Sequence, residues 1–130
     1  MIKVLECIEW KAPNRPGEMS RFVEHFKKSG VSLDGLWNCG SGGGYIGAAG
    51  KQPAKLRAAL KAIGVKASPS KCFLVAGKDK AGALVGVLAA LGKAKINVEC
   101  STAAAAQGKF GALIWVKDRD LAKARRVLKA

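Results

Sequence analysis

The pattern of apolar positions repeats after 65 residues, which is half of the chain. Two segments show the i, i+3, i+4, i+7 spacing of an amphipathic helix in the same phase: Met19, Phe22, Val23 and Phe26, then Leu84, Val87, Leu88 and Leu91. A second pair of stripes follows at the same shift: Leu56, Ala59, Leu60 and Ile63, then Leu121, Ala124, Arg125 and Leu128. Because no gap is needed to superimpose the halves, the sequence predicts two copies of one module.

Strand-like segments flank these helices at matching places. Residues 7–10 align with 72–75, residues 31–33 with 96–98, and residues 45–47 with 110–112. The first half adds a candidate last strand at residues 65–70, which completes a βαββαβ order. We therefore expect an α+β fold of two ferredoxin-like repeats, residues 1–68 and 69–130, each with an antiparallel sheet and its helices on one face.

The second half has no counterpart of that last strand before the sequence stops at Ala130. An open sheet edge invites pairing with another chain. We expect a second copy to cover this edge, and hence a homodimer or larger homo-oligomer.

Composition sets further bounds. The longest apolar run, residues 81–92, is shorter than the roughly 20 residues of a membrane span, and the start lacks the form of a signal peptide. We therefore expect a cytoplasmic protein without membrane contact. Its four cysteines are expected to be reduced and mostly buried, and with one histidine and no Cys-x-x-Cys pair we expect no metal site and no cofactor.

A short polar turn precedes the first helix of each half. The first reads Asn14-Arg15-Pro16-Gly17 and the second Asp79-Lys80-Ala81-Gly82. Asn and Asp are good N-caps, Pro is tolerated in a first turn, and Gly lets a neighbour approach the backbone. The free N–H groups of such a helix end can hold a carboxylate or phosphate, whereas the negative charge of the second turn favours an amino group. Capping and packing alone would also explain these residues.

With these turns and the repeat, the chain resembles a tandem ACT-domain protein, a family that regulates amino-acid metabolism. The resemblance implies an effector amino acid or similar zwitterion at the interface between modules, with its carboxylate on backbone N–H groups and its amino group on Asn or Asp oxygens. The positions that correspond to the family's ligand-binding residues are Asn14, Pro16, Gly17, Ser32, Asp79, Gly82 and Asn97. Ser32 replaces a frequent Asn and Lys80-Ala81 replaces Arg-Pro, so one of the two sites could be degenerate.

The resemblance also bears on what the chain lacks. Both halves are used by the modules, so we expect no catalytic domain and a regulatory action in trans on a partner enzyme. His25 lies beside Glu24, off the apolar stripe, and is expected at the surface. The glycine-rich segment 40–44 is expected to be a hairpin, because no helix follows it as a phosphate-binding loop would require.

The alternative is an RNA-binding βαββαβ protein that uses its basic surface. A net charge of +14 favours an anionic partner, and residues 108–115 partly match an RNA-recognition strand, with Phe73 as a second candidate stacking residue. Against this, Ala112 takes the place of a stacking aromatic and aromatic residues make up only 6% of the chain. The lysines and arginines are also spaced as solvated helix faces would be.

Overall fold

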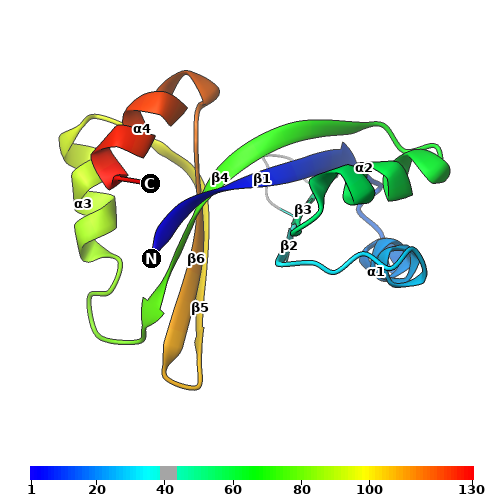
Figure 1. Ribbon diagram of the computed structural model, residues 1–130, viewed down its shortest axis with the longest axis horizontal. Coiled ribbons are helices and arrows are strands. Elements are labelled where there is room, and N and C mark those ends of the chain that lie inside the picture. Colours follow the sequence, from blue (N-terminus) through cyan, green and yellow to red (C-terminus); the bar gives the residue numbers. More distant parts are fainter. Residues whose placement is uncertain (39–43) are drawn as a thin grey trace. The chain divides into compact units, whose positions relative to one another are not determined.

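The computed structural model describes residues 1–38 and 44–130, so most of the hairpin expected at residues 40–44 lies outside the described part. Its elements are labelled in Figure 1: β1 (Ile2–Lys11), α1 (Glu18–Lys28), β2 (Gly35–Trp37), β3 (Tyr45–Ala49), α2 (Pro53–Ala62), β4 (Ala67–Lys78), α3 (Val85–Lys93), β5 (Val98–Ala106), β6 (Lys109–Val116), the 3-10 turn Asp118–Asp120 and α4 (Leu121–Leu128). They form two compact units. We call Glu6–Lys71 the central unit, and Met1–Leu5 together with Cys72–Ala130 the terminal unit.

The central unit has the strand order β2-β3-β1-β4. β1 pairs antiparallel with β3, where Trp10 lies opposite Ile46, and β3 pairs antiparallel with β2, where Trp37 lies opposite Gly47. Alternate residues of a strand point to one face, so Ile8 and Trp10 share a side of the sheet. This order is that of the ferredoxin-like arrangement, with β4 in the place of the last strand.

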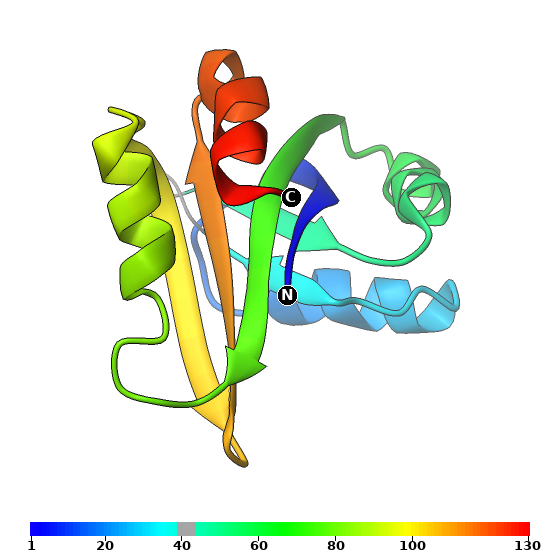
Figure 2. The same cartoon turned by 60° about the vertical axis from the view of Figure 1, so that its left-hand side comes forward.

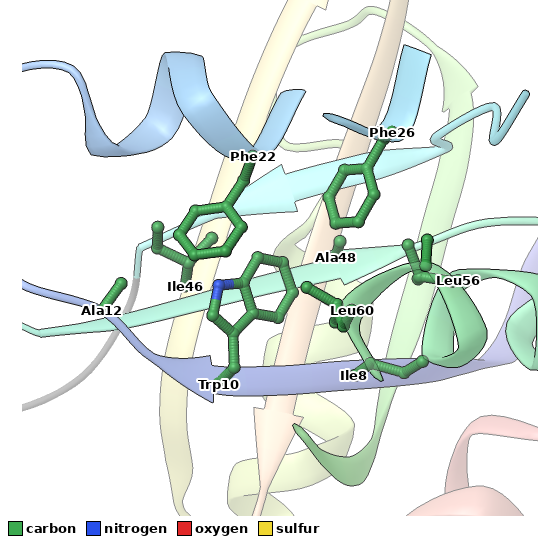
Figure 3. Close-up of a cluster of buried hydrophobic side chains, with 10 residues drawn as sticks. Ile8, Trp10, Ala12, Phe22, Phe26, Ile46, Ala48, Leu56 and Leu60 are labelled. Carbon is green, nitrogen blue, oxygen red and sulfur yellow. The ribbon is translucent and has the colours of Figure 1, made fainter. Parts of the chain in front are cut away.

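Helices α1 and α2 cover that face of the central sheet and close a core around Trp10 (Figure 3). The indole is 1% exposed and meets Phe22 and Phe26 edge-on, with ring centroids 5.2 and 5.8 Å apart. Its buried Nε1 has no hydrogen-bond acceptor among the described residues, and it lies on the side of the ring toward Phe22 (Figure 3). Edge-to-face packing of this kind stabilises a core beyond the apolar area it buries.

The terminal unit repeats the plan. β6 lies between β4 and β5, with Phe73 opposite Ile114, and β5 returns into β6 through Gln107 and Gly108, whose φ angles of 53° and 76° suit a two-residue type I′ hairpin. Helices α3 and α4 contact each other and lie on one side of this sheet (Figure 2). Their buried residues Leu91 and Leu128 complete a second core.

The terminal unit takes its fourth strand from the start of the chain. Its order is β5-β6-β4-β1, and residues Met1–Leu5 occupy the last place. Met1 and Ala76 exchange two backbone hydrogen bonds, with N···O distances of 2.8 and 2.9 Å. Ile2 and Val4 pack against the second core. Residues Met1–Leu5 therefore provide the strand beside β4 for which the second half has no segment of its own. The two units are accordingly not the continuous segments 1–68 and 69–130.

Helices α1 and α3 end with the same backbone conformation, at positions 65 residues apart. Gly30 follows α1 with a φ of 69°, and Lys95, 65 residues later, follows α3 with a φ of 59°. In both places the next N–H reaches back to the helix, from Val31 to Phe26 O and from Ile96 to Leu91 O, each at 2.9 Å. This is the hydrogen-bond pattern of a Schellman ending. Lys95 adopts a left-handed conformation that glycine adopts at less cost.

The cysteines differ in part from expectation. Cys7 and Cys72 are buried, but Cys100 is disulfide-bonded, so the expectation of four reduced thiols is wrong. Cys39 lies outside the described residues. No helix in the described part of the chain is both long enough and apolar enough to cross a membrane.

Candidate ligand-binding turns

The first polar turn, Asn14 to Gly17, borders only a small pocket. Asn14 lines a pocket of about 70 Å³ together with Arg15, Glu18, Asn38 and Tyr45. Asn14 does not cap α1, contrary to expectation: Gly17 stands at the N-cap with a φ of 88°, and no side chain caps this end. The φ of Gly17 belongs to the left-handed region, which explains the glycine without a ligand. Pro16 is exposed in the same turn and does not line the pocket.

Glu18 supplies a negative charge at this helix end. Its carboxylate accepts a hydrogen bond from Nε of Arg15 at 2.9 Å and another from an Nη of Arg21 at 3.1 Å. The side chain of Glu18 is 8% exposed. The hydrogen bond from Arg15, followed by that from Arg21, lowers the pKa of the Glu18 carboxyl. An anion at a helix N-terminus is favourable, and Glu18 supplies one in the first turn of α1.

The second turn is different, because it opens on an apolar hollow. Asp79 and Gly82 line a pocket of about 420 Å³ whose other walls come from the rest of the turn, from α3 and from the β5–β6 hairpin: Ala83, Leu84, Val85, Leu88, Ala103, Ala104, Ala105 and Phe110. Val85 is 65% exposed and Leu88 is 42% exposed. The backbone N–H of Asp79 donates to Gly108 O at 2.9 Å, which fixes the turn. No acidic residue lies in the first turn of α3, so the positive end of this helix is not neutralised from within.

Ser32 and Asn97 lie away from the turn pockets. The second strand of the central unit begins at Gly35, so Ser32 lies in the loop before it and lines another pocket, of about 440 Å³, at the far end of α1. Asn97 is exposed, immediately before β5, and does not line the pocket of Asp79. The structure thus brings Asp79 together with Gly82, and Asn14 together with Glu18, but joins neither pair to its second-strand residue.

The residues that shape these pockets were only partly visible in the sequence. Arg15, Glu18 and Arg21 are spaced by three, and this spacing could have indicated an ion-paired cluster on one helical turn. The pocket walls at Ala103–Ala105 and Phe110 depend on which face of the hairpin turns toward α3. The sequence pattern does not predict which face of the hairpin turns toward the helix.

His25, Phe73 and the tryptophans are partly or fully buried. His25 is half-buried and not a surface residue as expected, because Nε2 lies 2.6 Å from the carbonyl oxygen of Ala59. Phe73 is fully buried, so it cannot stack on a base as the RNA-binding alternative requires. Trp10, Trp37 and Trp115 are 1%, 7% and 7% exposed and belong to the interior. Among the described residues, no three His, Cys, Asp or Glu side chains are grouped so as to hold a metal.

Comparison with known proteins yields matches at the level of structure. No protein-family model and no curated protein matches the chain. Protein BT0572 from Bacteroides thetaiotaomicron superimposes with a TM-score of 0.81 at 21% identity, over 98% of this chain and 88% of that one. The regulatory subunit of aspartate kinase from Thermus flavus superimposes with a TM-score of 0.64 at 14% identity, over 99% of this chain and 94% of that subunit. The chain has the fold of an ACT-domain protein.

A larger enzyme contains the same ACT fold. Escherichia coli aspartokinase III, in complex with lysine and aspartate, superimposes with a TM-score of 0.58 at 12% identity. The match covers 97% of this chain but only 31% of the aspartokinase. At such identities the likeness establishes the ACT fold and not the ligand.

Proposed function

We propose that this protein is a regulatory protein that binds an amino acid at the turn of the terminal unit. The observation that carries the proposal is the position of Asp79 at an open pocket of about 420 Å³ with apolar walls. Ligand sites combine apolar walls with a few polar groups in this way. The central turn offers only about 70 Å³ and already contains the carboxylate of Glu18, so we place one functional site per chain.

The chemistry of the terminal turn suits a zwitterion with an apolar side chain. The Asp79 carboxylate, which makes no hydrogen bond or ion pair with a described side chain, would accept hydrogen bonds from the amino group. The first turn of a helix leaves N–H groups without intrahelical acceptors. In α3 the N–H of Val85 already donates to Gly82 O, so the next ones, of Gly86 and Val87, would hold the carboxylate. Val85, Leu88 and Phe110 would contact the side chain.

Regulation would take place in trans, on a cytoplasmic partner enzyme. The regulatory subunit of aspartate kinase from Thermus flavus, which has the same fold, supports this arrangement. A second copy of the chain would cover the open pocket and the edge strand β5, whose residues Ser101–Ala106 are exposed. Size-exclusion chromatography with light scattering tests this last point, since a monomer at every concentration would contradict it.

The binding proposal is tested by a thermal-shift screen of the twenty amino acids, with a short single-stranded RNA in parallel. A ligand at 100 times its dissociation constant adds about 2.7 kcal/mol of stability, which gives a clear rise in Tm. We expect one or a few apolar amino acids to raise Tm, and Asp79→Asn to abolish that rise. Asn14→Ala is the matched control in the central turn and should leave it unchanged.

Two results would contradict the proposal. If Asn14→Ala removed the amino-acid effect and Asp79→Asn kept it, the central turn would be the site. If no amino acid raised Tm while RNA did so in a salt-dependent manner, the basic surface would be the functional one.

A further inference from the structure

One helix lies in a stretch of the chain without any negative charge. Asp and Glu are absent from residues 35 to 78, whereas lysine and arginine recur throughout the second part of that stretch. Helix α2 lies in its middle, and its first turn contains no acidic residue. The ion pairs among the described residues involve Glu18 and Glu99 only, so none neutralises α2.

The exposed face of α2 has a definite pattern. Leu56, Ala59 and Leu60 are buried. At 3.6 residues per turn, the opposite side has Ala54 and Ala58 at its centre, and both are exposed. Three exposed basic residues of the helix surround this centre, Lys55, Arg57 and Lys61, and exposed Lys51 lies just before its first turn. We call these six residues the α2 face.

The charges of the α2 face repel one another in the isolated protein. Arg57 and Lys61 are four residues apart, so they are neighbours on the helix surface, and like charges at this spacing destabilise a helix. Lys55 lies in the first turn, where the helix dipole also disfavours a positive charge. A bound anionic surface would remove both effects.

Two hydrogen bonds to neighbouring residues also fix the position of α2. Nζ of Lys55 donates to Gly30 O at 3.1 Å, and His25 contacts the carbonyl oxygen of Ala59. These bonds tie α2 to α1 and to the residue that follows its C-cap. The α2 face is thus presented by a fixed helix and not by a loop, which lowers the ordering cost of binding.

We propose that the α2 face binds an acidic helix of a partner protein. The small side chains of Ala54 and Ala58 let another backbone approach closely, and the basic side chains around them, above all Arg57 and Lys61, would meet glutamates of that helix. The face contains no aromatic or hydroxyl side chain, although such groups are common in nucleic-acid contacts. The choice of a protein partner rests on the proposed regulatory function, whereas the preference for an acidic surface rests on charge alone.

The test uses the whole chain and a fluorophore-labelled synthetic peptide that repeats Glu-Glu-Ala-Leu, which is acidic and amphipathic when helical. Fluorescence anisotropy gives its Kd without any amino acid present. We expect Arg57→Glu with Lys61→Glu to weaken binding about tenfold or more. Lys93→Glu with Arg126→Glu is the matched control, because these exposed residues of α3 and α4 change the net charge equally, and it should change Kd less than about twofold.

A single further variant separates a helix partner from a nucleic acid. Ala58→Lys adds a positive charge at the centre of the α2 face, so it should strengthen binding to any partner that responds to charge alone. It should weaken binding to a helix that packs on Ala58. We therefore expect a higher Kd for the peptide and a lower Kd for a single-stranded RNA of equal charge.

Equal loss in both charge-reversal variants, or tighter peptide binding by Ala58→Lys, would overturn the inference. A preference of the wild-type protein for the RNA, lost on reversal of Arg57 and Lys61, would assign the α2 face to nucleic acid instead. The thermal shift with amino acids is measured on the same variants. It reports separately on the Asp79 pocket, so failure of one proposal can be told from failure of the other.

Discussion

His25 of α1 donates from Nε2 to the carbonyl oxygen of Ala59 in α2, at 2.6 Å. A carbonyl oxygen only accepts, so Nε2 carries the hydrogen. Ala59 lies one turn before the end of α2, where the last carbonyl groups have no intrahelical donor. The histidine therefore completes a helix end on the neighbouring element.

We expect His25→Ala to lower the free energy of unfolding by about 1 kcal/mol, because the Ala59 carbonyl loses its donor in a half-buried place. Glu24→Ala is the matched control on the same helix, since Glu24 is exposed and makes no ion pair with any described residue. Urea unfolding of both variants gives the comparison. Equal stability of the two would show that the His25 bond contributes nothing.

We expect the folded protein to lose stability in acid as Glu18 becomes protonated. Its pKa is lowered in the folded protein by hydrogen bonds from Arg15 and Arg21. The contribution of these bonds is therefore fully present above the pKa of the unfolded chain, and is lost as the pH falls through the lower folded value. We expect Glu18→Gln to be less stable than the wild type at neutral pH and to approach it in acid. Glu24→Gln should show no such convergence in pH-dependent urea unfolding.

Gly47 is expected to be intolerant of a side chain. A Cβ at this position would overlap the indole of Trp37, which lies across the β2–β3 pair. We expect Gly47→Ala to destabilise the protein by about 1–3 kcal/mol, the usual cost of overpacking. Gly111→Ala is the control in β6, where a Cβ would meet nothing within 4 Å. If both variants unfold at the same urea concentration, the Trp37 ring does not fill this space in solution.

Val4 tests the strand that the terminal unit takes from the start of the chain. Val4→Ala should cost roughly 1 kcal/mol of stability, because its partly buried methyl groups pack on the second core. It should also speed hydrogen exchange of the Ala76 amide, whose acceptor is Met1 O. Lys3→Ala, on the exposed side of the same strand, should do neither. Unchanged exchange at Ala76 in the Val4 variant would argue against this strand pairing.

The sequence predicted the elements better than their connections. The stripe of Phe22 and Phe26 and its counterpart at Leu91 are buried as predicted, because helical periodicity is a local property. Val23 and Leu88, which share the stripe, are 40% and 42% exposed. The strand after α1 starts at Gly35 and not at residue 31, since the helix ending at Gly30 and the loop take up the intervening residues. Periodicity does not report such offsets.

The sequence predicted where the two polar turns lie, but not which side chains surround them. Asp79 and Gly82, both named from the second turn, line one pocket. The filling of the first turn by Glu18 depends on two arginines folding back over one carboxylate. The placement of Met1–Leu5 beside β4 depends on a pairing between distant segments, and local patterns contain no information about it.

That pairing imposes an order on folding during synthesis. The central unit is one continuous segment, Glu6–Lys71, and can form as soon as its last strand has left the ribosome. The hydrogen bonds between Met1 and Ala76 span 75 positions, so residues 1–5 cannot pair until the segment around Ala76 has been made. Contacts of such long range form slowly, because the chain between them must first be ordered. We therefore expect a nascent chain in which the central unit is folded while residues 1–5 are still unpaired, and these residues pair with β4 only when the terminal unit assembles.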